Sequence, residues 1–292
     1  MMPKNSLTSK STADDAVGGR SLAGLRCLVT GAGSGIGVET VRALAKGGAD
    51  VLLAVRTPAD GERVIAGLPG VAGKLAVRAI DLSDLASVRA FAAATSETFD
   101  VVINNAGVMA TPLGFTKQGF ETQMGINHLA HFLLVQLLRA NLSPKARVVC
   151  VASEAHRRGS VEGMLATLDT DPKYQARKYS AFGAYGDSKL ANMAFVKGLT
   201  KRGTTAFALH PGVINTNLTR HMGVLATVWG LASIFMKSPA QGAATSTFAA
   251  TAPGIEQYSG IYLSDCNEKT PKFNLDDALV DKVWALSERA VA

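Results

Sequence analysis

Short apolar runs alternate along this chain with longer segments that have a helical pattern. Most of the runs lack the polar alternation of a half-exposed strand. The predicted strands are 26–31, 49–55, 75–81, 100–107, 146–153 and 205–212. Such strands are typical of a parallel sheet covered by helices on both faces. The intervening segments, such as 38–48 and 126–140, would be the crossover helices. The sequence therefore predicts an α/β fold, a Rossmann-type doubly wound parallel sheet in a single domain.

The length and composition favour one domain without a membrane anchor. The 292 residues suit one large α/β unit, and no apolar stretch is long enough to cross a bilayer. Residues 1–21 are polar and have no apolar signal region, so we expect a disordered tail followed by the domain at 22–292. Three widely spaced cysteines (Cys27, Cys150, Cys266) favour free thiols in a reducing, cytoplasmic setting.

The net charge of +7 needs a separate explanation, because it could suggest a nucleic-acid partner. The basic residues are scattered, and the longest adjacent cluster is Arg157-Arg158. A basic surface that attracts an anionic small ligand explains the charge as well, so no nucleic acid is expected.

A glycine-rich segment follows the first predicted strand directly. It reads TGAGSGIG from Thr30 to Gly37, and a helical pattern begins there. Gly31, Gly35 and Gly37 would allow a tight turn and a close approach of the backbone to a pyrophosphate at the helix N-terminus. The spacing differs from the usual dinucleotide fingerprint, and a flexible surface turn is the alternative. Its place in the first βα unit favours cofactor binding.

The end of the second predicted strand bears on which cofactor binds. A site for NAD usually has an acidic residue there, whereas this chain has Val55 followed by Arg56. A guanidinium can pair with a 2′-phosphate, so NADP(H) is favoured over NAD(H). The alternative is that Arg56 is simply a solvated surface residue.

The segment YGDSK places Tyr185 and Lys189 one helical turn apart, on one face of a helix. A neighbouring ammonium would lower the pKa of the phenol, so that Tyr185 could exchange a proton with a carbonyl or alcohol oxygen. Ser153 follows the fifth predicted strand, at the edge where α/β sheets hold their sites, and its hydroxyl could bind the same oxygen. The structural alternatives are a packed tyrosine and a capping serine.

Several motifs occur together in an order that resembles one family. These are TGAGSGIG, Asp81-Leu82, NNAG at 104–107, Asn127, Ser153, YGDSK and HPGVINT at 210–216. Over about residues 22 to 290 the chain resembles the short-chain dehydrogenase/reductase family. The segments NHLAHFLL, YGDSKLAN and YLSDC resemble its retinol-dehydrogenase-like branch.

The resemblance implies roles for individual residues. The catalytic group would comprise Ser153, Tyr185, Lys189 and Asn127, with Lys189 also binding the nicotinamide ribose and Asn127 linking a proton relay through water. The residues expected to bind the cofactor are Gly31, Gly33, Ser34, Gly35, Ile36, Gly37, Arg56, Asp81, Leu82, Asn104, Ala106, Gly107, Tyr185, Lys189, Pro211, Gly212, Val213 and Thr216.

Other segments bear on the substrate and the partners. The insert at 154–184 is expected to line the substrate entrance, with His156 near enough to contact substrate, and 217–239 is an apolar candidate lid. An apolar lid implies a lipophilic alcohol or carbonyl substrate, although a helix packed on the core fits the pattern equally well. His128 and His131 are read as structural, and no metal is expected. The resemblance also implies a homodimer or homotetramer formed through helix faces.

The leading hypothesis is an NADP(H)-dependent oxidoreductase that transfers a hydride between nicotinamide and a lipophilic alcohol or carbonyl substrate. Two alternatives stay open: a reductase of a conjugated carbon–carbon double bond, and a non-catalytic NADP(H)-binding sensor.

Overall fold

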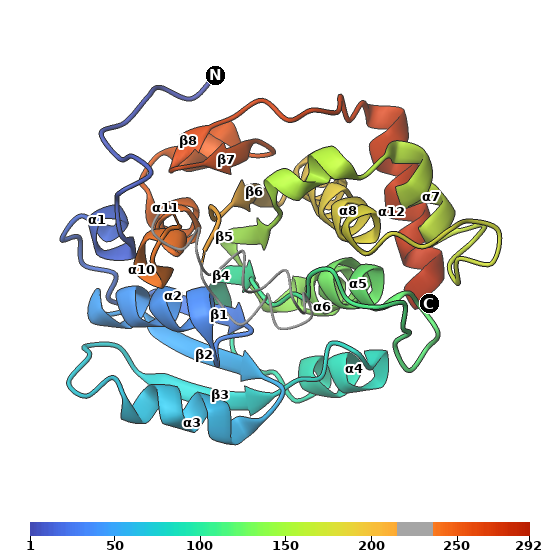
Figure 1. Cartoon of the computed structure of the whole chain (residues 1–292). Coiled ribbons are helices and arrows are strands. Elements are labelled where there is room, and N and C mark those ends of the chain that lie inside the picture. Colours follow the sequence, from blue (N-terminus) through green and yellow to red (C-terminus); the bar gives the residue numbers. More distant parts are fainter. Residues whose placement is uncertain (215–235) are drawn as a thin grey trace.

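One eight-stranded sheet forms the centre of the protein in the computed structural model, which describes residues 1–214 and 236–292 (Figure 1). The strands are β1 (Arg26–Thr30), β2 (Asp50–Val55), β3 (Leu75–Ala79), β4 (Phe99–Asn104), β5 (Leu142–Val151), β6 (Thr205–His210), β7 (Tyr262–Ser264) and β8 (Asn267–Glu268). Their order across the sheet is β3-β2-β1-β4-β5-β6-β7-β8. All neighbouring pairs are parallel except β7 with β8. The predicted doubly wound sheet is confirmed.

Helices cover both faces of this sheet (Figure 1). One face carries α1 (Ala13–Val17), α2 (Gly35–Lys46), α3 (Pro58–Ala66), α10 (Pro239–Gly242) and α11 (Ala244–Thr251). The other carries α4 (Leu85–Ala93), α6 (Ala130–Leu137), α7 (Val161–Leu168), α8 (Ala181–Lys201) and α12 (Asp277–Val291). Shorter turns are α5 (Thr122–Met124), the π-helical η1 (Gly125–Leu129), and the 3-10 turns η2 (Arg139–Asn141), η3 (Glu154–Arg158) and η6 (Ile255–Tyr258).

Successive residues of each strand alternate between the two cores. In β1, Leu28 packs toward the α4, α6 and α8 face, whereas Cys27 and Val29 pack toward α2 and α11. Because both faces are buried, the strands read as continuous apolar runs. This is why all six predicted strands appear, with ends that differ by a few residues. The short edge strands β7 and β8 have no such run and were not predicted.

The N-terminal segment differs from the expected disordered tail. Thr12 caps α1 in a capping box with Asp15, and Ala13, Ala16 and Val17 are buried. Asp14 also accepts from Arg42 of α2 at 3.1 Å. The buried side chains of α1 and its N-terminal cap give this segment a defined structure, although its overall polarity predicted disorder. The expectation was therefore wrong for Ala13–Val17.

Aromatic side chains bind α12 to α6 and α8. The ring of Trp284 lies 5.0 Å from that of Phe132 and 5.9 Å from that of Phe195. A Cβ at Gly198 would come within 2.6 Å of the Trp284 ring, so the glycine allows this close packing. These faces of α6 and α8 are thus covered within the chain. In the described part of the chain, none of the helices has the length and hydropathy needed to span a membrane.

Candidate active site

The glycine-rich turn joins β1 to α2 with little room for side chains. Gly31 has a φ of +65°, and a Cβ there would lie 2.8 Å from the Cα of Ala106. A Cβ at Gly37 would lie 2.3 Å from the carbonyl oxygen of Gly31. The Ser34 hydroxyl makes no hydrogen bond to the first turn of α2. Backbone N–H groups at the start of this helix are therefore available to an anion, which fits a dinucleotide phosphate.

A hydrogen-bond network anchors the neighbouring loop after β4. The Thr30 hydroxyl accepts from the backbone N–H groups of Asn105 and Ala106, each at 3.0 Å. It lies 2.9 Å from Nε2 of His131. Nδ1 of His131 lies 3.1 Å from the Asn127 carbonyl and must donate to it, so Nε2 accepts the Thr30 proton. Thr30 and His131 were not predicted as part of the site.

Asn104 occupies a different place from the one expected. Its side chain is buried and its Nδ2 lies 3.5 Å from Sγ of Cys150, so it does not line the cavity. Asn105 lines it instead, and donates from Nδ2 to the Thr30 carbonyl at 2.8 Å. Asn104 is the last residue of β4 and points into the core, whereas the next residue leaves the strand. The residue that lines the cavity is therefore one position after the predicted Asn104.

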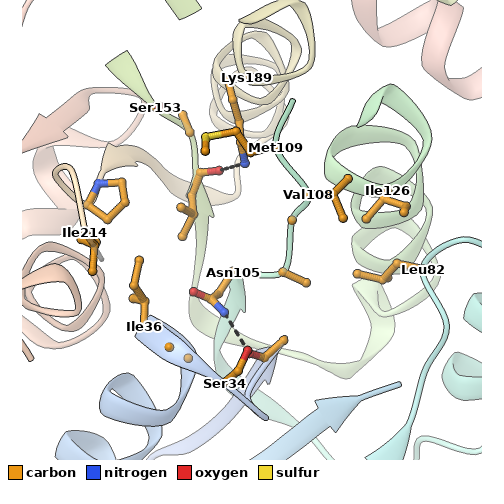
Figure 2. A pocket seen from close by; sticks show the side chains of 18 of the residues that line it. Ser34, Ile36, Leu82, Asn105, Val108, Met109, Ile126, Ser153, Lys189 and Ile214 are labelled. Carbon is orange, nitrogen blue, oxygen red and sulfur yellow. Dashed lines mark hydrogen bonds between the residues drawn. The ribbon is translucent and has the colours of Figure 1, made fainter. Parts of the chain in front are cut away.

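One cavity of about 810 Å³ contains most of the remaining predicted residues. Figure 2 shows Ser34 and Asn105 toward one end and Ser153 and Lys189 toward the other. The predicted residues that line it are Gly31, Gly33, Ser34, Gly35, Ile36, Gly37, Arg56, Asp81, Leu82, Ala106, Gly107, Ser153, Tyr185, Lys189, Pro211, Gly212 and Val213. Thr216 and residues 217–235 of the candidate lid lie outside the described residues. Glu154, Arg158 and Phe182 of the insert expected at the substrate entrance also line the cavity. Further lining residues, which were not predicted as site residues, include Asp60, Arg63, Met109, Ile126, His210 and Ile214.

The Tyr185 and Lys189 side chains lie on one face of α8, as their spacing predicts. Lys189 Nζ is 5.6 Å from the centre of the Tyr185 ring and donates to the Val151 carbonyl at 2.7 Å (Figure 2). Ser153 follows β5 and accepts from the Ala155 N–H at 3.1 Å, so its hydroxyl caps η3. Because this contact uses a lone pair, the hydroxyl proton remains able to donate to another oxygen.

The pKa of Tyr185 moves in the direction opposite to the one expected. Burial raises it to about 12, and a hydrogen bond with Ser153 opposes the rise. Burial also lowers the pKa of Lys189 to about 8. Desolvation disfavours the charged form of each group and is the largest cause of both shifts. At neutral pH the protein's own groups therefore keep Tyr185 as a neutral phenol, and Lys189 is not among the causes of its pKa shift.

Asn127 lies in η1, whose π-helical turn interrupts the run from α5 to α6. Its side chain accepts from the Val108 N–H at 2.8 Å, and donates to the Val108 carbonyl and to Ser188, each at 3.0 Å. A Cβ at Gly107 would lie 3.1 Å from Asn127 Oδ1 and 3.5 Å from Lys189 Nζ. Asn127 is thus buried directly behind the cavity wall and holds the loop that follows Gly107. Such π-turns are frequent at functional sites.

The histidines have separate surroundings. His156 is buried, with Nδ1 at 2.7 Å from the Ser153 carbonyl and Nε2 accepting from the Lys272 N–H at 3.2 Å. It points away from the cavity, so the expected substrate contact is wrong. Both ring nitrogens of His128 lie near Asn192 and Ser287. The structural interpretation of His128 and His131 is therefore supported by their hydrogen bonds. His210 lines the cavity, and burial lowers its pKa to about 4, which keeps it neutral.

Comparison with known proteins gives the same family as the motifs. Residues 26–165 match the model of the short chain dehydrogenase family. The chain is 40% identical to human "Retinol dehydrogenase 12" over 91% of this chain and 86% of the relative. A crystal structure of an uncharacterized protein from Mycobacterium paratuberculosis is 35% identical, with a TM-score of 0.75 and 97% of each chain covered. A Pseudomonas aeruginosa RhlG/NADP complex is 26% identical, with a TM-score of 0.61 over 84% of this chain and 96% of that one. The chain therefore belongs to the short-chain dehydrogenase/reductase family of oxidoreductases, in its retinol-dehydrogenase-like branch.

Proposed function

We propose that this protein transfers a hydride between NADP(H) and a lipophilic alcohol or carbonyl compound by a Ser153–Tyr185–Lys189 mechanism. The observation that carries the proposal is the shared cavity. Ser153, Tyr185 and Lys189 line it together with the glycine turn, so that one space can hold both a dinucleotide and a substrate.

The chain's own residues would bind the reacting oxygen and move its proton. Reduction adds a hydride to the carbonyl carbon and a proton to its oxygen. Tyr185, a neutral phenol at neutral pH, would donate that proton while the Ser153 hydroxyl donates a hydrogen bond to the same oxygen. A bound nicotinamide dinucleotide would supply the hydride in reduction and accept it in oxidation. Lys189 would position its ribose, and Asn127 would hold the loop behind it and serve the proton relay.

The preference for NADP(H) rests on cations beside the glycine turn. Arg56 and Arg63 both line the cavity, and Val55 stands where an acid would bind a ribose hydroxyl. Arg63 also pairs with Asp60. Two guanidinium groups suit a 2′-phosphate better than a 2′-hydroxyl. The related RhlG structure was solved with NADP, which agrees with this preference.

The lipophilic substrate class rests on the apolar side chains in the cavity wall. Met109, Ile126, Phe182, Val213 and Ile214 all line the cavity, with Met109 beside Lys189 (Figure 2), and such walls suit an apolar ligand. Relatives named retinol dehydrogenases are consistent with this substrate class. The cytoplasmic location and the homodimer or homotetramer remain predictions. The faces of α6 and α8 that contact Trp284 of α12 are covered within the chain, so an assembly would use other faces.

The proposal is tested by measuring turnover of a panel of aldehydes, ketones and enones with NADPH and by identifying the product of each reaction. An alcohol is expected, whereas a saturated ketone would point to the double-bond reductase. In Tyr185→Phe, we expect kcat to fall about a hundredfold or more, because the proton donor is lost. NADPH binding should be kept. Tyr174→Phe is the control, because Tyr174 lies in the 154–184 insert and does not line the cavity. If no compound in the panel were turned over, the non-catalytic NADP(H)-binding sensor would be favoured instead.

A further inference from the structure

The two adjacent arginines after Ser153 have different surroundings, and only one faces the active site. Arg157 pairs with Glu154 at 2.8 Å and does not line the cavity. Arg158 lines it, and its guanidinium lies 5.2 Å from the centre of the Phe182 ring. The charge of the second arginine therefore faces the space where a substrate would bind.

Arg158 lies at the end of the cavity that holds Ser153 and Tyr185. It ends η3, the turn that Ser153 caps, and Phe182 precedes Tyr185 by three residues on α8. A Cβ at Gly186 would lie 2.4 Å from the Gly159 N, so η3 and α8 are in close backbone contact beside Tyr185 (Figure 1). This contact leaves η3 little freedom to move relative to Tyr185. The glycine turn, where the cofactor phosphates would bind, is at the other end.

No carboxylate of this chain neutralises Arg158. Within residues 1–214 and 236–292 it forms no salt bridge, and the sequence of 215–235 contains neither Asp nor Glu. The nearby Glu154 is already used, because it accepts from Arg157, from Lys269 at 3.2 Å and from Tyr262 at 2.9 Å. Arg158 is exposed, so its guanidinium lies at the mouth of the cavity and is open to a ligand that enters from solvent. A planar guanidinium matches a carboxylate with two parallel hydrogen bonds.

We propose that Arg158 forms a subsite for an anionic group on the substrate, and that the preferred substrates are apolar carbonyl or alcohol compounds with a carboxylate remote from the reacting carbon. The apolar body would contact Phe182 and Met109, and the carboxylate would pair with Arg158 at the rim. This inference rests on the proposed function and narrows its substrate class. The alternative is that Arg158 only packs on Phe182 and binds no ligand, and the experiment must distinguish the two roles.

Medium-chain ω-oxo fatty acids and their methyl esters, at several chain lengths, form matched substrates that differ in one charge. The ratio of kcat/KM for acid over ester is measured within each variant, so that general damage to the active site cancels. In the wild type we expect the acid to be favoured by about tenfold or more at one chain length, and the ratio to fall as salt increases. Arg158→Gln should bring the ratio to about one, and Arg158→Lys should keep part of it. Arg157→Gln is the matched control and should keep the wild-type ratio.

Binding separates this proposal from the proposed function. In calorimetry with NADPH present, the wild type should bind a medium-chain carboxylic acid more tightly than the corresponding alcohol, and Arg158→Gln should lose the difference. If the binding difference holds while no aldehyde is turned over, the proposed function fails and the subsite stands. An equal preference for acid and ester in the wild type, or an acid preference that survives in Arg158→Gln, would overturn the subsite.

Discussion

Thr30 links the end of β1 to the loop behind the cofactor site, and its hydroxyl offers a sharp test of that arrangement. Thr30→Val keeps the shape of the side chain but removes the hydroxyl. Two backbone N–H groups, those of Asn105 and Ala106, then lose an acceptor at 3.0 Å. Nε2 of His131 loses its donor at 2.9 Å. The change therefore affects three polar groups at once.

The size of the effect follows from how buried these three groups are. An unsatisfied buried polar group costs about 1–3 kcal/mol. The Ala106 N–H is half-buried, so water can partly replace the hydroxyl and its loss costs about 1 kcal/mol. The Asn105 N–H keeps a second acceptor, the Ile103 carbonyl at 3.0 Å, so its loss costs less. His131 is fully buried and cannot recruit water, so its cost lies toward the upper part of that range. We expect Thr30→Val to lower the free energy of unfolding by about 3–4 kcal/mol, a large part of a typical domain's stability.

Urea unfolding measures this loss, provided that the m-value stays constant between variants. Thr40→Val is the matched control, because Thr40 is equally buried but its hydroxyl only donates to the Ile36 carbonyl within α2. It should cost about 1 kcal/mol or less. Thr30→Ser keeps the hydroxyl and should recover most of the loss. If Thr30→Val and Thr40→Val were destabilised equally, the network would not have the role assigned to it.

Two further predictions concern the charges around the cofactor site. Arg56→Gln should weaken NADPH binding by about tenfold while leaving NADH binding nearly unchanged, since a charge-assisted hydrogen bond to a phosphate contributes roughly 1.5–3 kcal/mol; equal losses for both cofactors in titrations would contradict the assignment. Burial lowers the pKa of Lys189 to about 8, so its charged form is present below that pH and is lost above it, whereas Tyr185 stays protonated up to about 12. We therefore expect kcat/KM for NADPH, which reports the free enzyme, to fall as pH rises through about 8. A profile flat to pH values well above 8 would show that the Lys189 charge is not needed.

The sheet and the glycine turn could be predicted because their signals are local. A strand buried on both faces must be apolar throughout, as Leu28 and Val29 on opposite faces of β1 illustrate. A turn that leaves no space for a Cβ must be glycine at Gly31 and Gly37. The φ of +65° at Gly31 and the contact of Gly37 with the Gly31 carbonyl act over a few neighbouring residues, as strand burial does, so the sequence records them directly.

Features that depend on three-dimensional placement were predicted less well. Whether Asn104 or Asn105 lines the cavity depends on where β4 ends, because a shift of one residue reverses the direction of a side chain. His156 follows Ser153 closely in sequence, but η3 turns its ring toward Lys272 and away from the cavity. Arg158 is two residues further along, and the same turn directs it into the cavity. Sequence distance alone cannot separate these cases.

The pKa values show the same limit most clearly, and they bear on the chemistry. Spacing along α8 places an ammonium beside a phenol, which by itself predicts a more acidic tyrosine. Burial is set by the packing of α8 against β5 and η3, and it reverses that prediction because it disfavours both charged forms. A neutral Tyr185 is ready to donate a proton at neutral pH but not to accept one. From the protein's own groups, we therefore expect the proton donation of carbonyl reduction to be easier at neutral pH than the proton abstraction of alcohol oxidation. Alcohol oxidation would need a higher pH or an added positive charge next to the phenol, of the kind that an oxidised nicotinamide carries.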